Sequence, residues 1–271
     1  MKLSTNSLYI VSTPIGNLDD VTFRALETLK NSDIILCEDT RRSLKLLTHF
    51  KIKKKLIPYH KFNEKKQVSN IIKYIKEGKI LSLISDAGTP LLSDPGRILI
   101  NQCIENEIKV VPIPGASSIT TAMSVSGFKD QFIFYGFLPK TENELKKTLA
   151  SLSTNLFSQV FFIPAIKINF YLKFFKDHYS GRKIFIAKEL TKIHETFFRN
   201  NIDDLKTFNN KVKGELTVII SEKNIEKKAL NKEIIVNKAK KYLKKYSLKD
   251  TVDLILESEK INKKEIYKLC L

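Results

Sequence analysis

The chain has 271 residues, of which 42% are hydrophobic and 28% charged, and its formal net charge at pH 7 is +18. This length accommodates two compact domains or one large domain, and the balance of apolar and charged residues excludes a disordered chain. No run approaches the roughly 18 consecutive apolar residues of a membrane span, so the pattern also excludes membrane-spanning helices.

The first 115 residues alternate short β-branched runs with longer amphipathic stretches. We predict strands at residues 8–11, 33–37, 56–59, 80–85 and 109–113. The clearest helix covers residues 64–77, where Ile71, Ile72 and Ile75 follow helical spacing and Gly78 stands at the expected C-terminal cap. Strands separated by helices predict a mostly parallel sheet flanked by helices, in an N-terminal α/β domain over residues 1–120.

The pattern changes after Gly127, where longer strands follow one another with fewer helices between them. We predict these strands at residues 131–138, 159–163, 182–190, 194–198 and 214–221. They indicate a second α/β domain with a mixed sheet, over residues 121–226. Residues 227–271 are predicted to form a basic helical tail, with Asn262 as an N-cap and Glu265 three residues later as its capping-box partner.

Cysteine usage and the first residues indicate the compartment. Cys37, Cys103 and Cys270 are far apart and show no Cys-x-x-Cys spacing, so we expect neither a disulfide framework nor a metal site. The apolar stretch at residues 8–11 is too short for the core of a signal peptide. The cytoplasm is therefore the expected location.

The positive charge is concentrated in two zones. Residues 51–79 and residues 223–249 each hold ten Lys against two Glu, a net charge of +8 in each zone. Clustered cations of this kind favour a polyanionic partner such as nucleic acid. The alternative is compositional drift, because only six of the 47 cations are Arg and the remaining Lys are what an A/T-rich genome produces without selection for binding.

Glycine and proline are scarce but gathered in three short windows, each directly after a predicted strand. Residues 12–20, 86–96 and 112–118 hold four of the nine Gly and five of the eight Pro. Open α/β sheets bind ligands at the carboxyl ends of their strands, and Gly lets a ligand approach bare backbone groups. The three windows therefore predict a pocket for a small polar ligand, although any one of them alone is ordinary turn chemistry. The chain contains neither Gly-x-Gly-x-x-Gly nor Gly-x-x-x-x-Gly-Lys-Ser/Thr, which argues against a standard dinucleotide or P-loop site.

Charged residues follow the second and third strands. Glu38, Asp39, Arg41 and Arg42 stand at a strand-to-helix turn, where carboxylates can orient a hydroxyl and guanidinium groups can bind a phosphate. The structural alternative is that Asp39 or Thr40 is only an N-cap, which accounts well for Asp39 and poorly for Glu38.

Three further polar residues lie near these loops. His60 is more simply explained as a structural or exposed residue than as a base. Asp86 opens the second window and can accept hydrogen bonds from a ligand. We expect Asp94, next to Pro95-Gly96, to shape the start of the following helix.

The order and spacing of these motifs resemble the tetrapyrrole (corrin and porphyrin) methylases. The motifs are Ser12-Thr13-Pro14-Ile15-Gly16-Asn17, Glu38-Asp39-Thr40-Arg41, Ser85-Asp86-Ala87-Gly88-Thr89-Pro90, Ser93-Asp94-Pro95-Gly96, Pro112-Ile113-Pro114-Gly115-Ala116-Ser117, Ala187-Lys188-Glu189-Leu190-Thr191-Lys192 and Gly214-Glu215-Leu216. Within that family they are most similar to bacterial enzymes that methylate the ribose 2′-oxygen of a cytidine in the decoding region of 16S ribosomal RNA. The resemblance covers nearly the whole chain.

This resemblance implies a two-domain α/β methyltransferase, a homodimer, that binds S-adenosyl-L-methionine in the cleft between its domains. Its implied partner is 16S ribosomal RNA within the small ribosomal subunit. The residues implied to bind the cofactor are Pro14, Gly16, Asn17, Asp86, Ala87, Gly88, Thr89, Pro90, Pro114, Gly115, Ser117, Glu189, Leu190, Gly214 and Glu215.

Methyl transfer from a sulfonium needs little covalent machinery, because the protein must mainly position the nucleophile and accept its proton. We therefore interpret Glu38, Asp39 and Arg41 as catalytic: Glu38 or Asp39 orients or deprotonates the 2′-hydroxyl, while Arg41 or Arg42 holds the adjacent phosphate. The two basic zones and the helical tail would hold RNA through its backbone and shape.

One segment departs from the family pattern. Relatives usually carry an aromatic-Glu-Ser-x-His-Arg segment after a strand of the second domain, where this chain has Phe162-Ile163-Pro164-Ala165-Ile166-Lys167. Only Lys167 remains there as a cation for a phosphate contact.

Two other interpretations stay open. The first is a methylase of a corrin or porphyrin precursor, a poly-carboxylate that a cationic cleft would also attract. The second is a basic RNA-binding assembly protein without catalysis, which the altered segment at residues 162–167 makes conceivable. Binding of S-adenosylmethionine would argue against the second.

Overall fold

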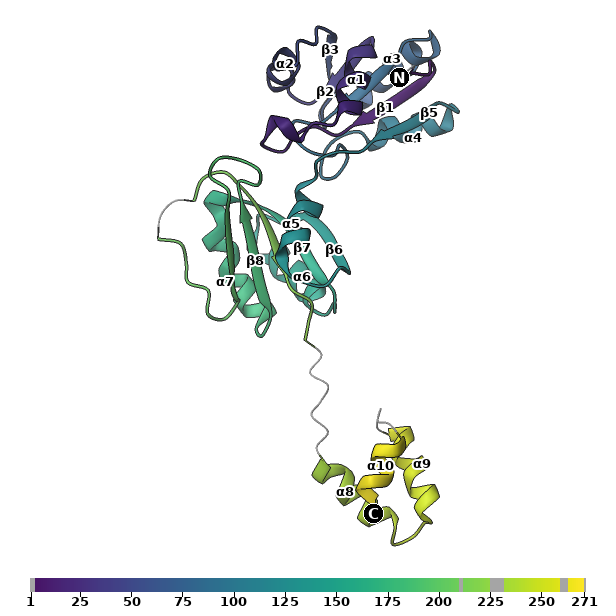
Figure 1. Ribbon diagram of the computed structural model, residues 1–271, viewed down its shortest axis with the longest axis vertical. Helices are drawn as coiled ribbons and strands as arrows, with labels where there is room; N and C mark the ends of the chain where they lie inside the picture. Colours follow the sequence, from purple (N-terminus) through teal and green to yellow (C-terminus); the bar gives the residue numbers. More distant parts are fainter. Residues whose placement is uncertain (1–2, 210–211, 225–231, 259–262, 271) are drawn as a thin grey trace. The chain divides into compact units, whose positions relative to one another are not determined.

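The computed structural model describes residues 3–209, 212–224, 232–258 and 263–270. The chain divides into two compact units, residues 1–223 and residues 224–271. The first unit contains two five-stranded sheets, and the second is helical (Figure 1).

The first sheet is entirely parallel, as the alternation of strands and helices predicted. Its strand order is β3-β2-β4-β1-β5, and each neighbouring pair runs in the same direction. The strands are β1 (Ser7–Val11), β2 (Ile34–Cys37), β3 (Lys55–Pro58), β4 (Leu81–Ile84) and β5 (Lys109–Ile113). Every residue of β1, β2 and β4 is buried, which is typical of parallel strands covered on both faces.

Helices cover both faces of this sheet. Side chains of α3 and α4 pack with Leu8 and Leu83 on one face, while side chains of α1 and α2 pack with Tyr9 and Ile35 on the other. The helices are α1 (Phe23–Asn31), α2 (Thr40–His49), α3 (Glu64–Lys76) and α4 (Arg97–Glu105), with a short 3-10 helix η1 (Leu18–Asp20) before α1. The helix predicted at residues 64–77 is confirmed to within a residue.

The strand order brings the three glycine and proline windows together. They follow β1, β4 and β5, and these strands are neighbours in the order β4-β1-β5. Because the strands are parallel, their carboxyl ends meet at one edge of the sheet. Hydrogen bonds join the windows directly: Thr13 and Gly88 exchange two backbone bonds of 2.9 Å, and the Ser12 amide donates to the Ile113 carbonyl at 3.2 Å.

The second sheet is mixed, in the order β6-β7-β10-β8-β9. The pair β6/β7 is parallel, and the other pairs are antiparallel. The strands are β6 (Phe132–Phe137), β7 (Ser158–Pro164), β8 (Lys183–Lys188), β9 (Thr196–Asn201) and β10 (Glu215–Ile220). The predicted second α/β layer is therefore confirmed.

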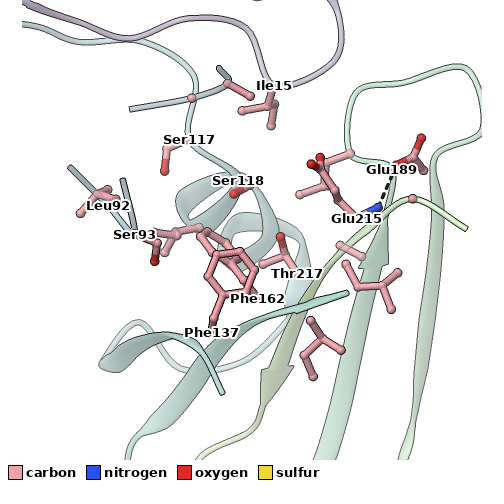
Figure 2. Close-up of a pocket in the computed structure, with 18 of the residues that line it drawn as sticks. Ile15, Leu92, Ser93, Ser117, Ser118, Phe137, Phe162, Glu189, Glu215 and Thr217 are labelled. Carbon is pink, nitrogen blue, oxygen red and sulfur yellow. Dashed lines mark hydrogen bonds between the residues drawn. The ribbon is translucent and has the colours of Figure 1, made fainter. Parts of the chain in front are cut away.

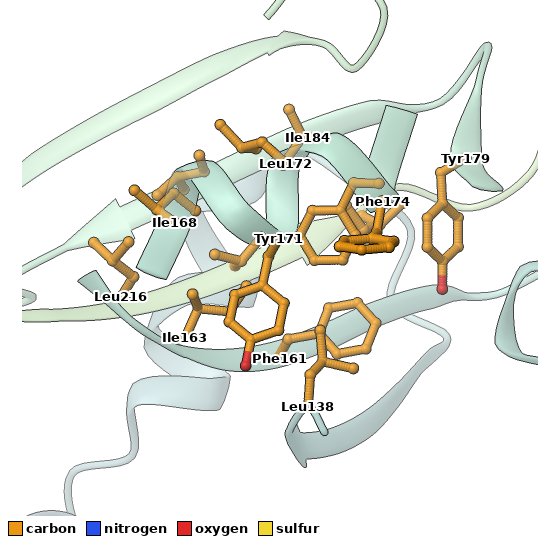
Figure 3. Close-up of a cluster of buried hydrophobic side chains, with 14 of the residues drawn as sticks. Leu138, Phe161, Ile163, Ile168, Tyr171, Leu172, Phe174, Tyr179, Ile184 and Leu216 are labelled. Atoms are coloured by element: carbon orange, nitrogen blue, oxygen red, sulfur yellow. The ribbon is translucent and has the colours of Figure 1, made fainter. Parts of the chain in front are cut away.

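Three α-helices pack on this sheet, α5 (Ser118–Ser126), α6 (Glu142–Ser153) and α7 (Ile168–Tyr179), and a 3-10 helix η2 (Ala165–Lys167) precedes α7. Leu145 and Leu149 of α6 and Phe175 of α7 are buried in one cluster with Phe161 of β7, part of which Figure 3 shows. Ile119 and Ala122 of α5 belong to a separate cluster that contains Val160 and Phe185, so the sheet has two apolar faces.

The second unit is a small helical bundle. Its helices are α8 (Lys232–Tyr242), α9 (Leu248–Ser258) and α10 (Lys263–Cys270), and its core contains Ile235, Ala239, Val252, Ile255 and Ile266. The predicted cap at Asn262 lies outside the described residues. The domain limits expected from the sequence, 1–120, 121–226 and 227–271, stay predictions. Over the described parts of the chain, no helix is both long enough and apolar enough to span a membrane.

Candidate methyl-donor site

A cavity of about 400 Å³ is lined by residues of both sheets in the first unit. From the first sheet come Ile15, after β1, and the loop after β4. The N-terminus of α5 and strands β6, β7, β8 and β10 supply the rest. Figure 2 shows Ser117 and Ser118 of this wall, with Glu189 and Glu215 opposite Leu92 and Ser93. A cavity of this size suits a small molecule that has both polar and apolar parts.

The first-sheet wall depends on two backbone positions. Gly88 has a φ of +77°, and a Cβ there would lie 3.2 Å from Cγ2 of Ile15, which also lines the cavity. Gly115 leaves room for Ser12, whose Cβ would be 2.9 Å from a Cβ at this position. A side chain at either position would therefore press against its neighbour.

Hydroxyl groups fix the same loops. Ser12 and Thr89 share a side-chain hydrogen bond of 3.1 Å, and the Thr89 hydroxyl also donates to the Ala116 carbonyl at 3.2 Å. Ser117 stands at the N-cap of α5 without using its side chain as a cap. The first amides of α5 and the side chains of Ser117 and Ser118 thus offer polar groups to a ligand in the cavity.

The second-sheet wall carries a clamped pair of carboxylates. Glu189 adopts a φ of +52°, and its Oε1 accepts from the Glu215 amide at 3.0 Å and from Nζ of Lys192 at 3.1 Å. Lys192 Nζ is also 3.4 Å from Oε2 of Glu215. Burial raises the pKa of Glu189, but the Glu215 amide and Lys192 outweigh it and hold that pKa below its usual value. Glu189 is therefore ionised and already paired.

Two aromatic rings contribute to the apolar part of the cavity. Phe137 of β6 and Phe162 of β7 meet edge to face, with centroids 5.4 Å apart and an interplanar angle of 61°, and Figure 2 shows them together. Such a pair offers a flat apolar surface beside polar groups.

The structure brings about half of the predicted cofactor residues into this cavity. Lining it are Ala87, Gly88, Thr89, Ser117, Glu189, Leu190, Gly214 and Glu215. The other predicted residues stand in the loops after β1, β4 and β5 but are not among the lining residues: Pro14, Gly16, Asn17, Asp86, Pro90, Pro114 and Gly115.

Gly16 and Asn17 join two loops of the first unit. The Asn17 amide donates to Oγ1 of Thr191 at 3.0 Å, and a Cβ on Gly16 would collide with Lys192 and with the Leu190 carbonyl. These two residues therefore fasten the loop after β1 to the turn after β8.

The predicted catalytic residues Glu38, Asp39 and Arg41 are not in the cavity wall. Asp39 is the N-cap of α2, and it accepts from the Arg41 amide at 2.9 Å and from Nη2 of Arg41 at 2.8 Å. These bonds hold the pKa of Asp39 far below its usual value. Burial, and next the charge of Asp86, raise the pKa of Glu38. The pKa values of these two adjacent carboxylates are therefore shifted in opposite directions.

Asp86, in the loop after β4, contacts the residues that follow β2. Its Oδ1 accepts from the Asp39 amide at 3.1 Å, and its Oδ2 is 3.2 Å from Nη1 of Arg42. Asp86 thus ties the start of α2 to the loop after β4. Nδ1 of His60, close to this group, is buried without a hydrogen-bond partner.

The expectation for Asp94 needs revision. Gly96, with a φ of +133°, occupies the N-cap of α4, and Asp94 lines the cavity instead. Burial and the nearby charge of Glu38 raise the pKa of Asp94 to about 6. The Asp-Pro-Gly sequence is typical of a helix start, and for that reason Asp94 was not predicted to line the cavity.

The other lining residues were not predicted to bind the cofactor, although some of them stand in the motifs quoted above. They are Ile15, Leu92, Ser93, Ser118, Ile119, Phe137, Phe162, Ile163, Pro164, Ala187, Lys192, Leu216 and Thr217. Most lie inside strands or next to them, where the sequence pattern predicts that an apolar residue belongs to the hydrophobic core. Among the described residues, no group of His, Cys, Asp and Glu is arranged to hold a metal ion.

Comparison with known proteins identifies the family. The family model of the Tetrapyrrole (Corrin/Porphyrin) Methylases matches residues 7–206. The chain belongs to this family. It is a methyltransferase, and the resemblance predicted from the sequence motifs is confirmed.

Relatives of this methylase share the name Ribosomal RNA small subunit methyltransferase I. One from Mesomycoplasma conjunctivae is 45% identical over 230 residues, which cover 84% of this chain and 95% of the relative. One from Thermotoga maritima is 43% identical, covering 80% and 98%. One from Rickettsia prowazekii is 43% identical over 269 residues, covering 97% and 95%.

Solved structures share the fold of this methylase. The methyltransferase CobJ matches with a TM-score of 0.61 at 16% identity, covering 80% of this chain and 94% of CobJ. A uroporphyrin-III C-methyltransferase from Thermus thermophilus, complexed with S-adenosyl homocysteine, matches with a TM-score of 0.56 at 13% identity, covering 80% and 97%. At these identities the likeness concerns the fold alone.

Proposed function

We propose that this methylase transfers the methyl group of S-adenosyl-L-methionine to the ribose 2′-oxygen of a cytidine in 16S ribosomal RNA. The observation that carries the proposal is the group of relatives, 43–45% identical, that bear the name of a small-subunit ribosomal RNA methyltransferase. The match to the relative from Rickettsia prowazekii covers 97% of this chain, a share that must include part of the basic helical unit.

The cavity fits the proposed cofactor. S-adenosylmethionine supplies an activated methyl group on a sulfonium, and the cavity volume of about 400 Å³ is in the range of small-molecule pockets. The backbone around Gly88 and the hydroxyls of Ser117 and Thr217 would hold its polar groups. Ile119 and Leu216 would cover its apolar parts. The remaining predicted cofactor residues stay predictions.

Exposed lysine side chains in the second unit support the choice of RNA as substrate. In the second unit, Lys240, Lys241, Lys244, Lys245 and Lys249 are exposed on or next to α8 and α9. Exposed cations of this kind bind phosphates whatever the base sequence. Folded RNA is recognised largely through its backbone and shape, so such contacts suit an RNA substrate. In the second basic zone, residues 225–231 lie outside the described part of the chain.

The guanidinium groups after β2 suit a phosphate next to the target ribose. The side chain of Arg41 is 87% exposed and that of Arg42 is 67% exposed, so both can reach a substrate while their carboxylate partners hold them in place. We retain Glu38, Asp39 and Arg41 as the proposed catalytic motif, in which the carboxylates orient the ribose hydroxyl and the guanidinium holds the adjacent phosphate. The homodimer implied by the family resemblance and the cytoplasmic location expected from the cysteine pattern are part of the proposal.

A tetrapyrrole precursor remains the second candidate substrate. The structural neighbours include a uroporphyrin-III C-methyltransferase, but the likeness is one of fold. The relatives with much higher identity favour RNA.

The test uses labelled S-adenosylmethionine with two acceptors, small ribosomal subunits and a uroporphyrinogen. We expect label in the RNA alone, and ribose mapping should place it on one cytidine that is unmodified when the gene is absent. Label in the tetrapyrrole would favour the second candidate. Label in neither acceptor, with no binding of S-adenosylmethionine, would favour the non-catalytic assembly protein.

A further inference from the structure

Three carboxylates line the cavity, and two of them are paired with one lysine. Glu189 and Glu215 both pair with Lys192, at 3.1 and 3.4 Å. Asp94, the third, has no ion pair among the described residues. Its charged neighbours, Glu38 and Asp86, are both acidic.

The backbone before Asp94 is held in an unusual conformation. Leu91 and Ser93 adopt φ values of +73° and +76°, which L-residues rarely take. Gly136 of β6 accommodates this loop, because a Cβ there would lie 2.7 Å from Oγ of Ser93. The strained loop thus holds Asp94 in the wall that also contains Phe137 and Phe162.

Methylation of a ribose hydroxyl requires a proton acceptor next to the methyl donor. A 2′-hydroxyl is weakly acidic, and a carboxylate with increased proton affinity is a better base than an ordinary aspartate. Asp39 does not meet this requirement, because Arg41 occupies both of its oxygens. The pKa of Glu38 is raised, but Glu38 is not among the residues that line the cavity.

We propose that Asp94 is a catalytic residue that accepts the proton of the ribose 2′-hydroxyl during methyl transfer, with Glu38 as a positioning residue behind it. This inference rests on the proposed function. In the reaction the bond from the 2′-oxygen to the methyl carbon forms as the sulfur–methyl bond breaks. The sulfonium becomes a neutral thioether, and the hydroxyl proton passes to the Asp94 carboxylate and then to solvent.

The charges around Asp94 set its behaviour with pH. Glu38 follows β2, Asp86 follows β4, and both repel the ionised form of Asp94. Arg42 and His60 act on Glu38, where their charges lower its pKa against the larger effects of burial and Asp86. Across the cavity the charged groups are Glu189, Lys192 and Glu215, which neutralise one another in part.

The test compares Asp94→Asn with wild type and with Asp130→Asn, a matched change at an exposed loop position. The measurement is single-turnover methylation of small ribosomal subunits, with S-adenosylmethionine affinity determined by calorimetry. We expect Asp94→Asn to lower the rate at least 100-fold, within the usual range for a general base, and to change cofactor affinity less than twofold. Asp94→Glu should recover part of the rate, and Asp130→Asn should match wild type.

The pH profile distinguishes catalysis from a merely structural role. The wild-type rate should rise tenfold per pH unit below about 6 and then level, because the base must be ionised. Asp94→Asn should lose this limb. Glu38→Gln should move the limb to lower pH, because removal of a like charge lowers the pKa of Asp94.

The results separate this inference from the proposed function. A wild-type enzyme that fails to methylate the particles overturns the proposed function. An active wild type with an Asp94→Asn rate within threefold, or with an unchanged acid limb, overturns the role of Asp94 alone. Loss of cofactor binding in both Asp94→Asn and Asp94→Glu would also overturn it, because Asp94 would then act on the donor or on the fold.

Discussion

Gly88 and Gly78 form a natural pair for testing the cavity wall. Both have positive φ, +77° and +85°, but a Cβ on Gly78 would meet nothing within 4 Å, whereas one on Gly88 would press on Ile15. We predict that alanine at either position lowers stability by roughly 1 kcal/mol, because both conformations disfavour a side chain. Only Gly88→Ala should weaken S-adenosylmethionine binding, by about tenfold in calorimetry. Equal affinities in the two variants would mean that the loop after β4 does not contact the donor.

Asp94 should also affect folding stability, with a sign opposite to that of most carboxylates. Its pKa is raised from 3.8 to about 6 in the folded protein, so the folded state binds a proton more tightly than the unfolded chain. The stabilisation from this proton is complete below pH 4 and is lost as pH rises through 6. Asp94→Asn should therefore be more stable than wild type at pH 8, by about 1–2 kcal/mol after allowance for solvent screening, and no more stable at pH 4. Urea denaturation at the two pH values checks this, and an equal difference at both would exclude titration as its cause.

At the level of elements, Arg182 links two parts of the second sheet layer. It is only 4% exposed, and its guanidinium donates to the carbonyls of Ser153, Asn155 and Ser221 at 2.7–3.3 Å. It thus satisfies carbonyls at the end of α6 and after β10. Arg182→Met should lower the free energy of unfolding by roughly 2–4 kcal/mol, because buried carbonyls would lose their donors. Denaturant unfolding, with the exposed Arg97→Met as control, measures the effect; a loss no larger than that of the control would contradict it.

The helices and strands could be predicted closely from local sequence patterns. The residues that line the cavity could be predicted only in part. Ile71, Ile72 and Ile75 mark one face of α3, and Gly78 marks its end, so this helix was predictable. The glycine and proline windows indicated one edge of the first sheet because strand direction fixes which ends meet. Phe137 and Phe162 were not predictable as lining, because their exposure depends on what the first sheet presents to them. Asp94 was misassigned because its neighbours carry a strong helix-start signal.

At the scale of the whole molecule, the lysines of the second unit should set the salt dependence of RNA binding. We predict that changing Lys240, Lys241, Lys244 and Lys245 to Gln reduces the slope of log affinity against log salt by about 3, because each lost phosphate contact removes 0.7–0.9. The matched control changes Lys147, Lys173, Lys183 and Lys206, all exposed on the first unit, to Gln. Filter binding to small-subunit RNA at several salt concentrations measures both. Equal slopes would indicate that the lysines of the second unit reflect composition alone.

The central claim is that the loops after β1, β4 and β5 and the strands of the second sheet together enclose the methyl donor. A crystal structure with S-adenosyl homocysteine, the demethylated product, tests it most directly. We expect density for the ligand in the cavity beside Gly88, Ser117 and Leu216, with its sulfur facing the wall that holds Asp94. Ligand density at any other surface of the protein, with this cavity closed by side chains, would contradict it.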